Sequence, residues 1–146
     1  MVHALEDIHR LLKPDGRLID IHPFAEAPLI EIHQGGKIAF AEQVPAYAVE
    51  DIQQAENALA HVIEHGLFAV ERAREFDFRI YASSVVELHD FLTEAEAFAN
   101  SSPPEETAAA QYAELAAHVE GLMRVAGEGA EVAHYEKVRI ARLAPL

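Results

Sequence analysis

Two histidines and a glutamate near the middle of the chain have the spacing of a zinc site. His61, Glu64 and His65 match the pattern H-x-x-E-H, in which two histidines one helical turn apart bind Zn²⁺ and the glutamate acts as a base. On a helix, however, His61 and Glu64 point about 140–160° away from the apolar stripe that Leu59 and Val62 help to form. A catalytic site would face a cleft. We therefore predict that these residues are solvated and that they hold no metal.

The composition excludes several other kinds of chemistry. The 146 residues include 25 acidic and 11 basic side chains, for a net charge of -14, and no Cys. Disulfides, thiolate metal sites and cysteine catalysis are therefore excluded, and the absence of Cys fits a reducing cytoplasm. The charge argues against nucleic acid and anionic membranes as partners. Because there is no apolar run of about 20 residues and no signal-peptide pattern, we expect a cytoplasmic protein.

The first twenty residues read as a helix, a tight turn and a strand. Leu5, Ile8 and Leu12 recur at helical spacing. Pro14-Asp15-Gly16 then predicts a turn in which Gly16 is free to take a positive φ, and the strand that follows ends at Pro23. This succession is typical of an α/β unit.

A β-hairpin is predicted over Pro28 to Gln43, around the pair Gly35-Gly36. Alternation places Ile30 and Ile32 on its apolar face and Glu31, His33 and Lys37 on its polar face. Glu31 and His33 could join His22 in a metal cluster, but the sequence gives no geometry for one.

The rest of the chain is expected to alternate helices with two strands. Glu50 to His65 has a helical stripe that ends at Gly66, and the period then drops to two from Leu67 to Tyr81, where Phe76 and Phe78 are predicted to be core residues. Capping boxes at Ser84/Glu87 and Ser102/Glu105 predict the starts of two helices. The stretch from Asn100 to Pro104 breaks the first helix, and the second runs to about Val125. A last strand is predicted over Val132 to Leu143. No linker separates two domains, so residues 1–146 are predicted to be a single domain.

The segment Ala4 to Asp20 resembles a known family. Its LLKPDGRLID stretch is similar to the helix, "LKPGG" turn and fifth strand of class I S-adenosylmethionine-dependent methyltransferases, with Asp15 where the first Gly is commonest. The resemblance implies that this strand is followed by a helix and by antiparallel sixth and seventh strands, for which 67–81 and 132–143 are the candidates. The implied fold is α/β: a partial doubly wound, Rossmann-like sheet with an inserted β-hairpin and three to four helices.

The resemblance does not extend to the cofactor site. In that family a glycine-rich loop follows the first strand and an acidic residue closes the second. The one G-x-G pattern here, Gly127 and Gly129, comes after a helix and before a strand, which is the wrong context. The chain therefore corresponds to a domain truncated relative to the family. We expect no cofactor for the isolated chain, and S-adenosylmethionine only if a partner completes the site.

Asp20 and His22 are the candidate site residues. The resemblance places them at the carboxyl end of a strand that would face a ligand crevice, where they could bind a substrate or accept a proton. The alternative is a structural strand end at which one polar group is buried and the other is hydrogen-bonded.

A strand left without its neighbour would have an open edge, so we expect a homodimer or a complementing chain. Two functions remain open. The chain is either a binding or oligomerisation module related to methyltransferases, and not an enzyme by itself, or the carboxyl half of a split or fragmented methyltransferase that acts on a small molecule.

Overall fold

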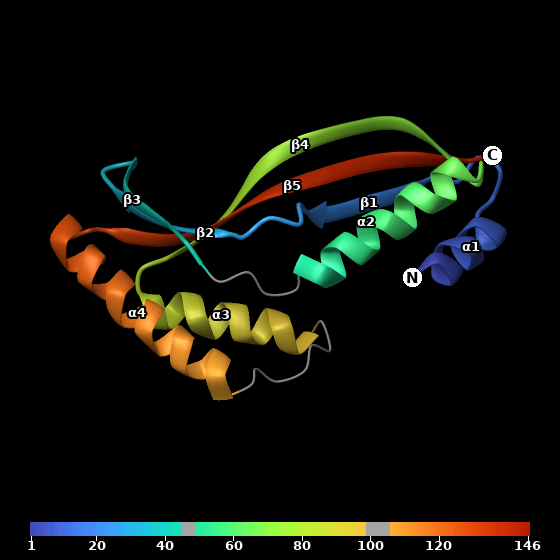
Figure 1. Ribbon diagram of the computed structural model, residues 1–146. Helices are drawn as coiled ribbons and strands as arrows, with labels where there is room; N and C mark the ends of the chain where they lie inside the picture. The colour runs from blue at the N-terminus through green and yellow to red at the C-terminus, as the bar shows by residue number, and fades with distance from the viewer. Residues whose placement is uncertain (45–48, 99–105) are drawn as a thin grey trace. The chain divides into compact units, whose positions relative to one another are not determined.

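A computed structural model describes residues 1–44, 49–98 and 106–146 of the chain (Figure 1). Its elements follow in the order α1 (Val2–Leu11), β1 (Leu18–Pro23), β2 (Leu29–Gln34), β3 (Lys37–Gln43), α2 (Val49–Glu64), β4 (Phe68–Ala82), α3 (Val85–Phe98), α4 (Glu106–Ala126) and β5 (Glu131–Pro145). The predicted mixture of helices and strands is confirmed: the described residues form four helices and a five-stranded antiparallel sheet. No helix among them is long and apolar enough to cross a membrane.

The last strand, β5, organises the sheet. Its carboxyl half pairs with β1, from Pro23 opposite Val138 to Leu18 opposite Leu143. Its amino half pairs with β2, which also pairs with β3, and β4 is the remaining strand that pairs with β5. Among the described residues β1 therefore has a single strand neighbour and lies at an edge of the sheet.

Contacts along the chain separate two compact units. The first consists of Met1–Ala27, Ala46–Phe78 and Glu136–Leu146, and the second of Pro28–Pro45 and Arg79–Tyr135. The strands β4 and β5 contribute residues to both units.

In the first unit, helices α1 and α2 pack against each other and on the ends of β4 and β5. The core consists of Leu59, Val62, Phe68, Ala141 and Leu143, with α1 contributing Val2 and Leu5 at its margin. Gly16 does not take the positive φ that we predicted. A Cβ there would lie 3.0 Å from the carbonyl oxygen of Lys13 and 2.9 Å from a methyl group of Leu12, so a larger residue would crowd the tight turn and displace the Leu12 side chain.

In the second unit the hairpin is confirmed. Gly35 and Gly36 have φ values of 58° and 75°, as a primed two-residue turn requires. Helices α3 and α4 supply Leu88, Leu92 and Val119 to a core that includes Ile30, Ile32 and Val132 of the sheet.

Capping residues mark the start of α3 and the end of α2. The backbone N–H of Glu87 donates to the Ser84 hydroxyl at 3.1 Å, as the first capping box predicts. The Glu87 carboxylate accepts hydrogen bonds from Ser83, one residue earlier than expected. Gly66, with φ 74°, follows α2 as predicted. The second predicted box, Ser102/Glu105, lies outside the described residues.

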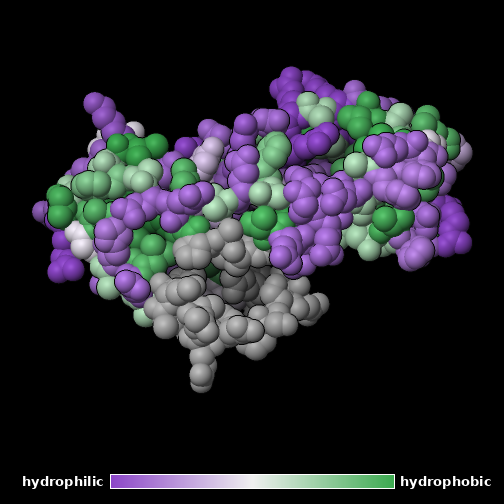
Figure 2. Space-filling model, viewed as in Figure 1, coloured by the Kyte–Doolittle hydropathy of each residue, from purple (hydrophilic) through white to green (hydrophobic). Residues whose placement is uncertain are grey.

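One prediction about burial is wrong. Phe76 and Phe78 are 41% and 42% exposed, because the middle of β4 has β5 as its only described strand neighbour and its side chains from Val70 to Phe78 are all exposed. Glu31 and His33, which were predicted to lie on the polar face of the hairpin, are 3% and 9% exposed, because side chains of β4 contact them there. On the face drawn in Figure 2, green hydrophobic residues interrupt the purple hydrophilic surface.

Candidate functional site

The end of β1 brings the two predicted site residues into direct contact. Asp20 and His22 occupy alternate strand positions and share one face of β1. Nδ1 of His22 lies 2.8 Å from Oδ2 of Asp20. Since a carboxylate only accepts, the ring nitrogen is the donor, and Asp20 fixes both the proton position and the orientation of the imidazole.

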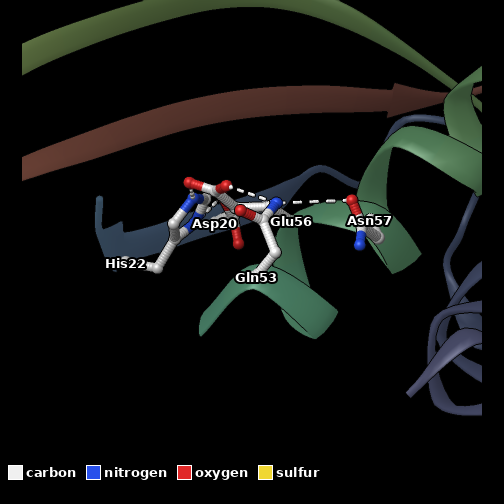
Figure 3. A network of polar contacts seen from close by, with 5 residues as sticks. All are labelled: Asp20, His22, Gln53, Glu56 and Asn57. Carbon is white, nitrogen blue, oxygen red and sulfur yellow. Dashed lines mark hydrogen bonds and ion pairs between the residues drawn. The ribbon is translucent and has the colours of Figure 1, made fainter. Parts of the chain in front are cut away.

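Helix α2 adds a second carboxylate on the other side of the imidazole (Figure 3). Oε1 of Glu56 lies 3.6 Å from Nε2 of His22, which is an ion-pair distance but too long for a hydrogen bond. The Gln53 side-chain amide donates to Glu56 at 3.2 Å and to Asn57 at 3.4 Å. The network therefore runs from Asp20 through His22 and Glu56 to Gln53 and Asn57.

Sequence reasoning missed the three helical members of this network. Gln53, Glu56 and Asn57 are spaced i, i+3, i+4, which places them on one face of α2. That spacing could have indicated a polar helix face, but no local pattern connects it to β1.

The imidazole is largely enclosed. The His22 side chain is 13% exposed, against 24% for Asp20 and 27% for Glu56, and its Nε2 is buried with no hydrogen-bond partner among the described residues. With Nδ1 holding a proton against Asp20, Nε2 is the atom that could accept or release a proton. Glu56 faces that atom. A ligand that used Nε2 would therefore have to displace Glu56, whereas a second proton on the ring would be held between two carboxylates.

A second polar cluster lies in the other compact unit. Arg79 donates from Nε to Oε2 of Glu31 at 2.7 Å and from Nη2 to Oε1 at 3.3 Å, and His33 donates to Glu31 at 2.8 Å. Burial would raise the pKa of Glu31, but the hydrogen bonds and charges of Arg79 and His33 outweigh it and hold the pKa below the usual 4.5. The Arg79 guanidinium also lies over the Tyr135 ring, 4.5 Å from its centre. The acceptor atoms of Glu31 are thus already used by protein donors.

The remaining candidates lack the geometry of a site. His61, Glu64 and His65 are exposed at the end of α2, where the two rings stack 3.9 Å apart and His65 bonds to the His61 carbonyl. Within residues 1–44, 49–98 and 106–146 no three His, Cys, Asp or Glu side chains are grouped to hold a metal ion. The metal cluster of His22 with Glu31 and His33, which the sequence left only as a possibility, is not among the groups that these residues form.

The glycine pair connects α4 to β5, as the sequence predicts. Gly127 and Gly129 have φ values of 99° and 78° and line an open pocket of about 400 Å³ with Met123 and Arg124. The pocket lies at the carboxyl end of α4, where the helix dipole is negative and disfavours anionic groups. The loop is thus built as a turn from helix to strand and not as an anion cradle.

Asp20, His22 and Glu56 remain the best-defined candidate site in the described part of the chain. They combine partial burial, a fixed proton position and a ring nitrogen without a hydrogen bond. Comparison of the chain with protein-family models, curated proteins and solved structures finds no match.

Proposed function

We propose that this chain is a methyltransferase-related module, equivalent to the carboxyl part of a class I S-adenosylmethionine-dependent sheet, that has no cofactor site of its own. Its role is to bind or oligomerise through the edge of β1. The observation that carries the proposal is the position of β1. This strand, which follows the LLKPDG turn, is hydrogen-bonded to β5 alone among the described strands.

The order of the elements supports this assignment. The proposed equivalents of the fifth, sixth and seventh strands are β1, β4 and β5, with α2 between the first two. As the resemblance implies, β5 is antiparallel to β1 and pairs with β4. The β2–β3 hairpin and helices α3 and α4 are then insertions, and the sheet is a partial doubly wound one.

The free edge of β1 has the properties of a pairing surface. Ile19 and Ile21 are 52% and 59% exposed, and an edge strand presents unpaired N–H and C=O groups to any incoming strand. No Lys, Arg or Pro interrupts Leu18–His22 to block such pairing. The proposed occupant is a strand from a second copy or from a complementing chain.

The alternative function is the carboxyl half of an active methyltransferase. The observation in its favour is the Asp20–His22 pair, which lies at the carboxyl end of β1, the end that faces ligands in a doubly wound sheet. In that case the same edge receives the cofactor-binding half. With a net charge of -14, the substrate is a small molecule and not a nucleic acid.

Calorimetric titration with S-adenosylhomocysteine distinguishes the two functions. We expect no binding heat for the isolated chain. Binding at micromolar strength would overturn the proposed binding or oligomerisation module and favour the carboxyl half of an active methyltransferase. Sedimentation of the double variant Ile19→Lys/Ile21→Lys tests the edge, because two charges on an edge strand oppose pairing. The matched control is Val125→Lys, which changes an apolar residue of α4 that is 74% exposed. A stable wild-type monomer that also captures no partner through β1 would refute the proposal.

A further inference from the structure

The middle of β4 presents aromatic and cationic side chains together. Phe76 and Phe78 are about two-fifths exposed, as is Val70, and Arg72 and Arg74 between them are exposed as well. These five residues occupy alternate positions, which a regular strand directs to one side. Exposed aromatics on a soluble chain are typical of an interaction surface.

Three cations beside β4 are each paired with a glutamate of that strand. Arg17 and Arg142 both bind Glu71, and Lys137 binds Glu75. Arg72 and Arg74 have no acidic partner among the described residues. In a chain with 25 acidic and 11 basic residues, Arg72 and Arg74 thus place two positive charges beside the exposed aromatic side chains of β4.

Helix α3 carries a surface of the opposite charge. Leu88 and Leu92 point into the core of the second unit, which leaves the other side of the helix in solvent. There Val86 is 62% and Phe91 49% exposed, and the acidic residues Asp90 and Glu94 are exposed beside them. This surface is thus apolar and anionic, whereas that of β4 is apolar and cationic.

The spacings of the charges also agree. Residues two apart on a strand are separated by about 6.6 Å, and residues four apart on a helix by about 6 Å along its axis. Arg72 and Arg74 can therefore reach Glu94 and Asp90 at the same time, while Phe76 packs on Val86, one helical turn before Asp90. A centre of aromatic contacts beside charge pairs is the usual composition of a protein interface.

We propose that the surface of Val70, Arg72, Arg74, Phe76 and Phe78 binds helix α3 of a second copy of this chain. The proposed dimer is two-fold, with the strand surface of each copy bound to the helix surface of the other. This interface is separate from the edge of β1 and does not depend on the methyltransferase proposal. A nucleic acid would also meet cations and aromatic rings on β4, but the chain's net charge of -14 opposes it.

The test is a charge reversal with rescue, followed by sedimentation of the full chain at about 0.15 M salt, where long-range repulsion is screened. Arg72→Glu/Arg74→Glu should raise the dimer dissociation constant at least about tenfold, because like charges then face each other. Asp90→Lys/Glu94→Lys should do the same. An equimolar mixture of the two variants should form a heterodimer. In one of its two contacts the charges of both the strand surface and the helix surface are reversed and therefore still attract, and in the other contact both surfaces are wild type.

The matched control is Lys37→Glu/Arg124→Glu, which makes the same change in charge at exposed positions outside both surfaces. Circular dichroism verifies that each variant is folded. A wild-type monomer, or two variants that do not rescue each other, would overturn the proposal. A dimer that is lost only in Ile19→Lys/Ile21→Lys would also overturn it, because association would then take place through β1. Binding of single-stranded RNA that Arg72→Glu/Arg74→Glu abolishes would overturn it as well, because the surface of β4 would then bind nucleic acid.

Discussion

Arg79 donates hydrogen bonds from two nitrogens of its guanidinium to both carboxylate oxygens of Glu31. Glu31 is almost fully buried and the Arg79 side chain is 24% exposed, so the ion pair is shielded from water. His33 completes the set of donors around Glu31. This buried charged network therefore lies on the hairpin, and the same hairpin contributes residues to the core of the second unit.

Removing the arginine should be costly because the carboxylate would remain buried with its main partner gone. We expect Arg79→Met to lower the free energy of unfolding by about 3 kcal/mol, within the range for breaking a buried pair. Urea denaturation measures the change. Arg124→Met, at an exposed arginine of α4, should alter stability by less than about 0.5 kcal/mol. Equal losses in both variants would contradict the role of Arg79.

The same carboxylate should make folding sensitive to acid. The pKa of Glu31 is below 4.5 in the folded chain, so the unfolded chain binds this proton more readily. The stability that Glu31 contributes is therefore complete above pH 4.5 and is lost as the pH falls through the folded pKa. In Glu31→Gln the unfolding free energy should decline less steeply between pH 5 and 3 (about two pH units). Parallel declines in variant and wild type would rule out this contribution.

His134 should produce a pH dependence nearer neutrality. It is 3% exposed, neither ring nitrogen has a hydrogen-bond partner among the described residues, and burial lowers its pKa below 6.5. The unfolded chain therefore takes up this proton first, and stability falls as the pH drops below 6.5. His134→Leu should stabilise the chain by about 1 kcal/mol at pH 7, since two unsatisfied polar atoms are removed. The gain in stability should be larger at pH 5.5 than at pH 7, and thermal denaturation at both pH values measures it. A gain that is absent, or equal at the two pH values, would contradict this prediction.

The Asp20–His22 contact can be weighed by a double-mutant cycle. Asp20→Asn, His22→Phe and the double variant should give a coupling energy of about 1 kcal/mol, because both side chains are largely shielded and 2.8 Å apart. The exposed pair His3 and Glu6 on α1, 3.0 Å apart, is the control and should show no measurable coupling. A coupling near zero at Asp20 and His22 would remove the basis for calling them a site.

Local signals in the sequence predict most of the elements and single out Asp20 and His22, but they do not predict the contact between these two side chains. Gly35-Gly36 predicts the hairpin, and Ser84 and Gly66 predict helix ends, because caps and turns depend on the residues nearest to them. Glu56 could not be found in this way, since its contact with His22 joins a strand to a helix that begins 26 residues after Pro23. The burial of Glu31 depends in the same way on Arg79, 48 residues further along the chain.

The exposure of Phe76 and Phe78 marks the limit of pattern reasoning. Alternating aromatics indicate a strand with one covered side, and the strand exists. The alternation does not show whether the residues that cover that side come from the same chain. For this reason the pattern predicted that Phe76 and Phe78 are core residues, whereas the structure leaves them exposed.

The pairing of β5 has a consequence for synthesis on the ribosome. Leu18 pairs with Leu143, and β1 and β4 have no described strand neighbour other than β5. Both strands must therefore wait, with their hydrogen-bonding groups unused, until the last residues of β5 leave the exit tunnel. Contacts so distant in sequence form slowly, and the waiting strands are prone to aggregate. Nascent chains of this protein are for that reason exposed to aggregation until β5 has left the tunnel.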